Sequence, residues 1–147
     1  MRLEAVENFR DFGGYPTAGG RQMKAGQFYR SASHGKATDA DLAAIEALGL
    51  ALIVDLRRPA ERARDPSRRP AGFVGQVIVN DHEESQDDDP WWNFVRGSDL
   101  SEATFRRYLI DYYRAAPFVG RHVDLFGRYF PALAEADGPV LIHCAAG

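Results

Sequence analysis

Val140-Leu141-Ile142-His143-Cys144-Ala145-Ala146-Gly147 is the stretch of this sequence that decides the fold. Its apolar beginning is typical of a strand that is buried on both faces of a sheet. The run leads directly into His143 and Cys144, and three small residues follow. Because ligands of open parallel sheets bind at the carboxyl ends of the strands, this end of the strand is where we expect chemistry.

Two further apolar segments, residues 50–56 and Gln76–Val79, also read as buried strands. Thr38 and Asp41 resemble a capping box, which predicts a helix that starts there and ends near Gly49. We expect three more helices at about residues 58–65, 101–115 and 118–136. Alternation of strands and helices predicts an α/β fold with a mostly parallel central sheet flanked by helices.

The remaining segments are predicted to be irregular or packed on the sheet. Residues 1–33 read as two or three short strands joined by glycine turns, and residues 81–99 read as a long acidic loop that contains Trp91 and Trp92. Helical spacing predicts two packed stripes in the later helices. Their members are Phe105, Tyr108, Leu109 and Tyr112, and then Val119, Val123, Phe126 and Phe130.

Composition limits the classes of protein to be considered. A length of 147 residues suits one domain, residues 1–147. Eighteen basic and 21 acidic residues argue against nucleic acid as a partner, and no apolar run approaches the roughly 20 residues of a transmembrane helix. The single cysteine excludes an intrachain disulfide and favours a reducing, cytoplasmic location. Composition does not indicate an oligomeric state.

Cys144 has two interpretations at this point. Most lone cysteines are small buried apolar residues. Against that, Cys144 lies just past its strand, and Ala145, Ala146 and Gly147 would let backbone N–H groups turn toward an anion. Such amides favour the thiolate, which is the nucleophilic form.

Four motifs in the same order resemble the protein tyrosine phosphatase superfamily. The segment from His143 to Gly147 resembles the start of its His-Cys-x5-Arg signature, in the His-Cys-x-x-Gly-Lys-Asp-Arg form of bacterial tyrosine and lipid phosphatases. Asn8-Phe9-Arg10-Asp11 resembles the family's opening segment. Phe28-Tyr29-Arg30-Ser31 resembles its Phe/Tyr-Arg-Ser strand, and Asp55-Leu56-Arg57 with Glu61 resembles its Asp-Leu-Arg…Glu element.

The resemblance implies a phosphatase that acts on phosphorylated proteins or phospholipids without a cofactor or a metal. Cys144 would attack phosphorus, the amides of Ala145, Ala146 and Gly147 would bind phosphate, and His143 would support the loop. The family's phosphate-binding Arg would stand three positions beyond Gly147. We therefore expect these 147 residues to be a piece of a longer protein without the C-terminal helices, and the piece alone to be nearly inactive.

Two more sites need a role. Asp81 follows a predicted strand at the same sheet edge, and we expect it to be the general acid, although the Asp of the family's signature loop is an alternative. Asp55 and Arg57 end another strand. An ion pair of Arg57 with Glu61 is one interpretation, and contact of Arg57 with phosphate is the other. His34, His82 and His122 have no metal-ligand spacing.

Two other functions fit parts of the sequence. A rhodanese-like sulfurtransferase also carries a cysteine between a strand and a helix and an Asp-x-Arg element, but Asn8 to Asp11 and His143 favour the phosphatase. A catalytically silent phosphate-binding module is the second alternative, because the signature Arg is not in this chain.

Overall fold

The central sheet has the predicted, mostly parallel architecture. The computed structural model describes residues 1–82 and 90–147. The described residues form a sheet of five strands in the order β1-β2-β5-β3-β4. The β1–β2 pair is antiparallel, and the other neighbours are parallel. The strands are β1 (Arg10–Asp11), β2 (Phe28–Ser31), β3 (Leu52–Asp55), β4 (Gln76–Val79) and β5 (Val140–His143).

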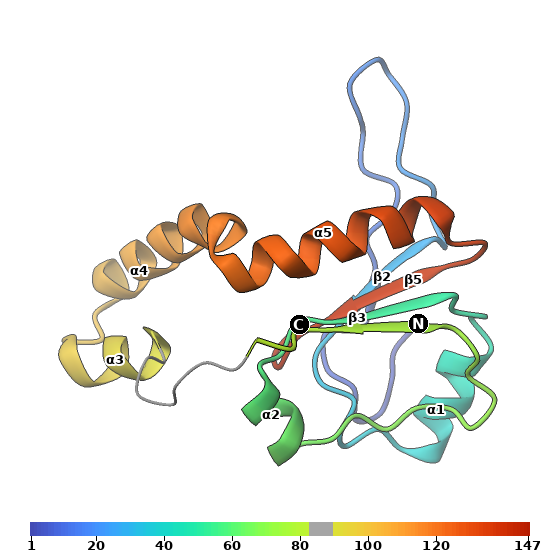
Figure 1. Cartoon of the computed structure of the whole chain (residues 1–147), viewed down its shortest axis with the longest axis horizontal. Coiled ribbons are helices and arrows are strands. Elements are labelled where there is room, and N and C mark those ends of the chain that lie inside the picture. Colours follow the sequence, from blue (N-terminus) through green and yellow to red (C-terminus); the bar gives the residue numbers. More distant parts are fainter. Residues whose placement is uncertain (83–89) are drawn as a thin grey trace.

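Helices cover both faces of this sheet (Figure 1). Helix α5 (Gly120–Glu135) crosses one face, while α1 (Asp39–Glu46) and α2 (Pro59–Arg64) lie on the other. Because side chains alternate along a strand, Leu52 and Val54 of β3 pack with α5, and Ile53 packs toward α1. The α/β class predicted from the alternation of elements is therefore confirmed.

Gln76–Val79 is a strand, as predicted, but the prediction that this strand is buried was wrong. Strand β4 is at the edge of the sheet, and within it only Ile78 is buried. A short apolar run alone does not distinguish an edge strand from a central one, because half-buried β-branched residues suit both positions.

The prediction of a loop over residues 81–99 was also wrong in part. Helix α3 (Pro90–Gly97) lies within it and carries Trp91 and Trp92, while residues 83–89 lie outside the described part of the chain. Helix α3 and helix α4 (Glu102–Ala115) extend away from the sheet (Figure 1). Trp91 and Phe94 of α3 contact Phe105 and Tyr108 of α4, so the predicted aromatic stripe packs between these two helices.

Helix α5 follows a short 3-10 helix, η2 (Ala116–Phe118), and only Phe126 of the four residues in its predicted stripe packs against the core. Val123 is 53% exposed and Phe130 is 61% exposed, whereas Leu125 and Tyr129 are buried against the sheet. Apolar residues occur around most of this helix, so its hydrophobic periodicity is compatible with either of two faces being buried. Contact with the sheet decides which face is buried.

The strand register brings the functional ends together. Asp55 of β3 pairs with His143 of β5 and with Val79 of β4, and Ser31 of β2 also pairs with His143. Helix α1 begins with the predicted capping box, in which Thr38 and Asp41 exchange hydrogen bonds. Asp41 also accepts hydrogen bonds from the backbone of Glu4 and Ala5, which ties the N-terminal segment to this helix.

Candidate active site

The loop that begins at Cys144 has its carbonyl groups turned outward. The Ala145 oxygen accepts a hydrogen bond from Ser33 N at 3.2 Å, and the Ala146 oxygen accepts one from Asn8 Nδ2 at 2.7 Å. Because C=O and N–H point in opposite directions in a trans peptide, the N–H groups of Ala146 and Gly147 face inward. The Gly147 N–H donates to Cys144 Sγ at 3.2 Å. The sulfur therefore lies inside a half-ring of backbone donors.

Gly147 is required at its position by sterics. Its φ is +85°, a conformation that favours glycine. A Cβ there would lie 2.7 Å from Asn8 Cβ and 2.8 Å from Ala32 N, well inside van der Waals contact. The loop thus approaches the N-terminal segment as closely as backbone packing allows.

His143 supports the loop from the buried side. Its side chain is 2% exposed, and its Nε2 lies 3.6 Å from Asp55 Oδ2. Nδ1 lies 3.5 Å from the carbonyl oxygen of Cys144. Burial lowers the pKa of His143, and the Asp55 charge opposes this, with a net pKa below the ordinary value. A neutral imidazole therefore stands directly under the cysteine.

His34, for which no sequence pattern suggested a place in this site, stacks on His143 with ring centroids 4.8 Å apart. Its Nε2 lies 2.8 Å from Ser31 Oγ, and the side chain is 2% exposed. The pKa of His34 is lowered to about 3, mainly by burial and secondly by the neighbouring His143. Both imidazoles are consequently neutral near pH 7.

Arg57 is hydrogen-bonded to several groups around the end of β3. Its Nε and Nη2 form a bidentate pair with the Asp55 carboxylate at 2.9 and 2.8 Å. Its remaining N–H donors bond Ser33 Oγ, the Asp65 carbonyl and Ser67 Oγ. All five donors of the guanidinium are thus occupied within the protein.

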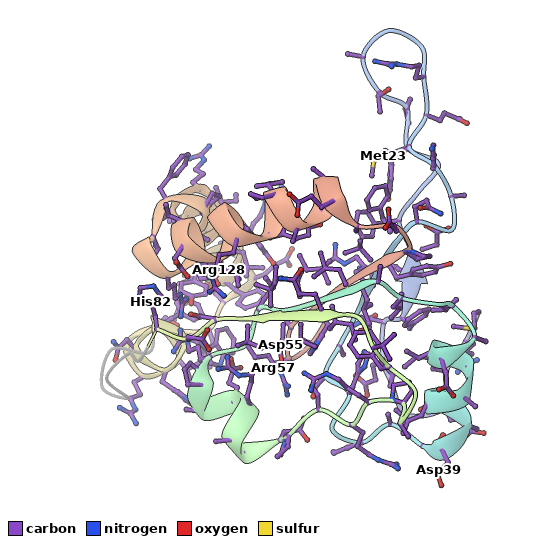
Figure 2. The ribbon with its side chains drawn as sticks, turned by 45° about the vertical axis from the view of Figure 1, so that its right-hand side comes forward. Met23, Asp39, Asp55, Arg57, His82 and Arg128 are labelled. Atoms are coloured by element: carbon purple, nitrogen blue, oxygen red, sulfur yellow. The ribbon has the colours of Figure 1, made fainter. Side chains whose placement is uncertain are left out.

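The expected pair of Arg57 with Glu61 is replaced by this arrangement, since Glu61 accepts a hydrogen bond from the backbone N of Arg58 instead. Figure 2 shows Arg57 beside Asp55 at the end of the strands. Hydrogen bonding to Asp55 raises the pKa of Arg57. Burial raises the pKa of Asp55, but the hydrogen bonds and charge of Arg57, with His143, outweigh burial and hold that pKa below its ordinary value.

Asp81 lies at the same sheet edge but not beside Cys144. It follows β4, which is two strands from β5, so the two strand ends are about 10 Å apart. Its carboxylate is 65% exposed and lies 3.6 Å from Arg62 and 3.7 Å from Arg128. Asp81, His82, Asp124 and Arg128 line a shallow, open depression, and Figure 2 shows Arg128 near His82.

Two further points about residues 1–82 and 90–147 concern metal ligands and membrane-spanning helices. These residues contain no group of three or more His, Cys, Asp or Glu side chains placed to hold a metal ion. Within the same ranges, no helix combines the length and apolar character that a membrane span needs.

Sequence reasoning selected the residues around Cys144 but missed those that hold its loop. It assigned no role of their own to Asn8 or Ser33. Asn8 contacts the loop from 138 residues away in the sequence. The one available signal was that Asn8 belongs to one of the four sequence motifs that together resemble the tyrosine phosphatase superfamily.

Comparison with known proteins gives the same family over the whole chain. A model described as the tyrosine phosphatase family matches residues 1–147. The chain is 30% identical over 149 residues to a "putative tyrosine-protein phosphatase" of Cupriavidus necator, covering 100% of this chain and 52% of that protein. It is 32% identical over 135 residues to a tyrosine-protein phosphatase of Nostoc commune, covering 90% of this chain and 42% of that protein. The chain spans about half the length of these curated relatives, and it belongs to the tyrosine phosphatase family.

Proposed function

We propose that the protein containing this chain is a cysteine-dependent phosphatase that hydrolyses phosphate monoesters of proteins, with phosphotyrosine as the first substrate to test. Membership of the tyrosine phosphatase family supports the reaction class. The observation that carries the proposal for this site is the loop after Cys144, where two carbonyls are tied outward and the Gly147 N–H meets the sulfur.

The loop geometry suits a tetrahedral anion attacked by sulfur. Inward N–H groups of Ala146 and Gly147 would donate to the phosphoryl oxygens, where negative charge develops in the transition state. The neutral His143 below adds no positive charge, so the polarity of the site comes from backbone dipoles.

The reaction has two displacements at phosphorus. In the first, the Cys144 thiolate forms an S–P bond, the P–O bond to the leaving group breaks, and a general acid protonates the departing oxygen. In the second, water attacks phosphorus and the S–P bond breaks. This step releases inorganic phosphate, and the proton of the water passes to the same carboxylate.

Asp81 is our candidate for the general acid. It stands at the carboxyl edge of the sheet, where a leaving group bound over Cys144 would point. To reach that group, the carboxylate would have to leave its contacts with Arg62 and Arg128, which are long and largely exposed. Exposed pairs of this kind are weak, so this movement costs little.

Trapping the intermediate in the full-length protein tests the function. The wild-type protein should release phosphate from para-nitrophenyl phosphate and from a phosphotyrosine peptide, and after acid quenching Cys144 should carry one phosphoryl group by mass spectrometry. Cys144→Ser should abolish both signals. Full turnover in Cys144→Ser, or sulfur transfer from thiosulfate without phosphate release, would refute the proposal.

A further inference from the structure

Two residues near the N-terminus contact the Cys144 loop directly. Asn8 Nδ2 donates to the Ala146 carbonyl at 2.7 Å. Arg10 connects the same groups, because its Nη1 donates to the Asn8 carbonyl at 2.6 Å and its Nη2 lies 3.5 Å from the Gly147 carbonyl oxygen. Together these two side chains contact the carbonyls of two consecutive loop residues, Ala146 and Gly147.

The backbone at Asn8 is in an uncommon conformation. Its φ is 54°, and among the described residues only Leu100, with φ 53°, shares positive φ without being glycine. The left-handed region disfavours L-residues by about 1–2 kcal/mol, although asparagine tolerates it better than most. Such conformations persist where the surroundings fix them, and they concentrate at functional sites.

The surroundings of Asn8 fix this turn from both sides. On one side, the Glu7 carbonyl accepts a hydrogen bond from Ala32 N at 2.9 Å, just past the end of β2. On the other side, Arg10 pairs with Arg30 in the β1–β2 ladder. The chain must turn between these two anchors, and the turn presents the Asn8 amide to the loop.

We infer that Asn8 and Arg10 are positioning residues for the phosphate-binding loop. Asn8 holds the Ala146 carbonyl outward, and Arg10 holds Asn8 in place. Because the Gly147 N–H belongs to the same peptide as that carbonyl, it stays directed at Cys144 Sγ and at the bound phosphoryl group. Without the Asn8 donor, the peptide between Ala146 and Gly147 can rotate, and a carbonyl oxygen would then face the anion. This inference rests on the proposed function, since it names what orients the amides of that site.

Asn8→Gly separates positioning from a purely structural role. Glycine removes the amide donor but accepts φ of 54° without strain, so the free energy of unfolding should stay equal or rise. Asn8 is exposed, so its removal leaves no buried cavity. Loss of one oriented donor lowers turnover by about 10²-fold in comparable sites, and we expect a fall in kcat/KM of about that size.

Leu100→Gly is the matched control. It removes a side chain from the other non-glycine residue with positive φ, and Leu100 is 55% exposed, before α4. This variant should keep the wild-type kcat/KM. Asn8→Asp adds a second comparison, because it keeps the shape of the side chain but replaces the donor with an acceptor that repels the Ala146 carbonyl. We expect it to lose at least as much activity as Asn8→Gly.

A second readout does not depend on turnover. Iodoacetamide alkylates Cys144, and inorganic phosphate bound in the loop should slow this reaction. In Asn8→Gly, the phosphate concentration that gives half-protection should rise at least tenfold, whereas in Leu100→Gly it should not change. Arg10→Lys, which cannot bridge two carbonyls, should raise it by a smaller factor.

The inference is overturned if Asn8→Gly keeps both wild-type kcat/KM and wild-type phosphate protection. It is also overturned if activity and the free energy of unfolding fall together in Asn8→Gly, since the residue would then only support the fold. Turnover that survives Cys144→Ser refutes the proposed function instead. In that case phosphate protection of Cys144 still tests the loop geometry by itself.

Discussion

Replacement of Arg57 by leucine should cost the protein a large part of its stability, because it leaves a buried carboxylate without its partner. The Asp55 side chain is fully buried, and Arg57 supplies two of its hydrogen bonds in bidentate geometry. Breaking a buried ion pair from one side typically costs about 3–5 kcal/mol. For a chain of this size that corresponds to a fall in Tm of about 10 °C. Urea unfolding followed by far-UV circular dichroism measures it.

The pH dependence of this loss gives a sharper test. In the wild-type protein the pKa of Asp55 is below its ordinary value, so its contribution to stability is present above about pH 4 and is lost as the pH falls further. Without Arg57, burial dominates and raises that pKa, so the variant loses stability as the pH rises. The difference between the two proteins should therefore shrink from pH 7 to pH 4.

A double-mutant cycle completes the experiment. Asp55→Asn in the Arg57→Leu background removes the unpaired charge and should recover about 2–3 kcal/mol, the upper range for residues in one network. Arg57→Lys keeps the charge but has only three donors for five partners, so it should fall between wild type and Arg57→Leu. A loss below about 1 kcal/mol in Arg57→Leu, with kcat/KM abolished, would instead indicate that Arg57 binds phosphate.

Three further predictions follow from single residues. The pKa of His34 is about 3 in the folded protein and about 6.5 when unfolded. The free energy of unfolding should therefore fall by about 1.4 kcal/mol per pH unit as the pH drops from 6 to 4. His34→Phe should flatten this slope when stability is measured by urea titration at each pH. Gly147→Ala should reduce kcat/KM at least tenfold, because its φ and the nearby Asn8 Cβ force the loop to move; wild-type activity would contradict the close packing. Asp81→Asn should slow hydrolysis of phenyl phosphate by about 10²-fold or more, and that of para-nitrophenyl phosphate less. Asp124→Asn, in the same depression, should slow neither reaction. Equal effects of the two substitutions would exclude Asp81 as the acid.

The sequence predicted most of the fold because its strongest signals are local. The apolar runs of β3 and β5 and the capping box at Thr38 each depend on neighbouring residues, and each element was found where expected. The errors were in properties that depend on distant packing. Whether β4 has a neighbour on both sides, and which face of α5 meets the sheet, are decided by strands and helices elsewhere in the chain.

In the candidate site, too, the residues with a local sequence signal were predicted, and those placed by distant packing were missed. Cys144 and His143 could be selected from the sequence because they stand at the end of a clearly apolar strand. The ion-pair partner expected for Arg57 was the wrong residue, because a spacing of four residues suggested Glu61. Only the structure shows that the guanidinium turns back to Asp55 at the end of the strand. His34 gave no sequence signal, because stacking on His143 exists only once β2 and β5 are paired.

The contacts that hold the Ala145 and Ala146 carbonyls outward are long-range, and this has a consequence for how the site forms. Ser33 and Asn8 hold the loop from 112 or more residues away, and β5 enters the sheet between β2 and β3. The entropy of closing such large loops must be overcome before these bonds form, so local helices precede them. The half-ring of donors around Cys144 can therefore exist only after β5 has been inserted at the centre of the sheet. Reactivity of this cysteine consequently reports the folded sheet, and unprotected, phosphate-insensitive alkylation would identify chains in which that insertion has not occurred.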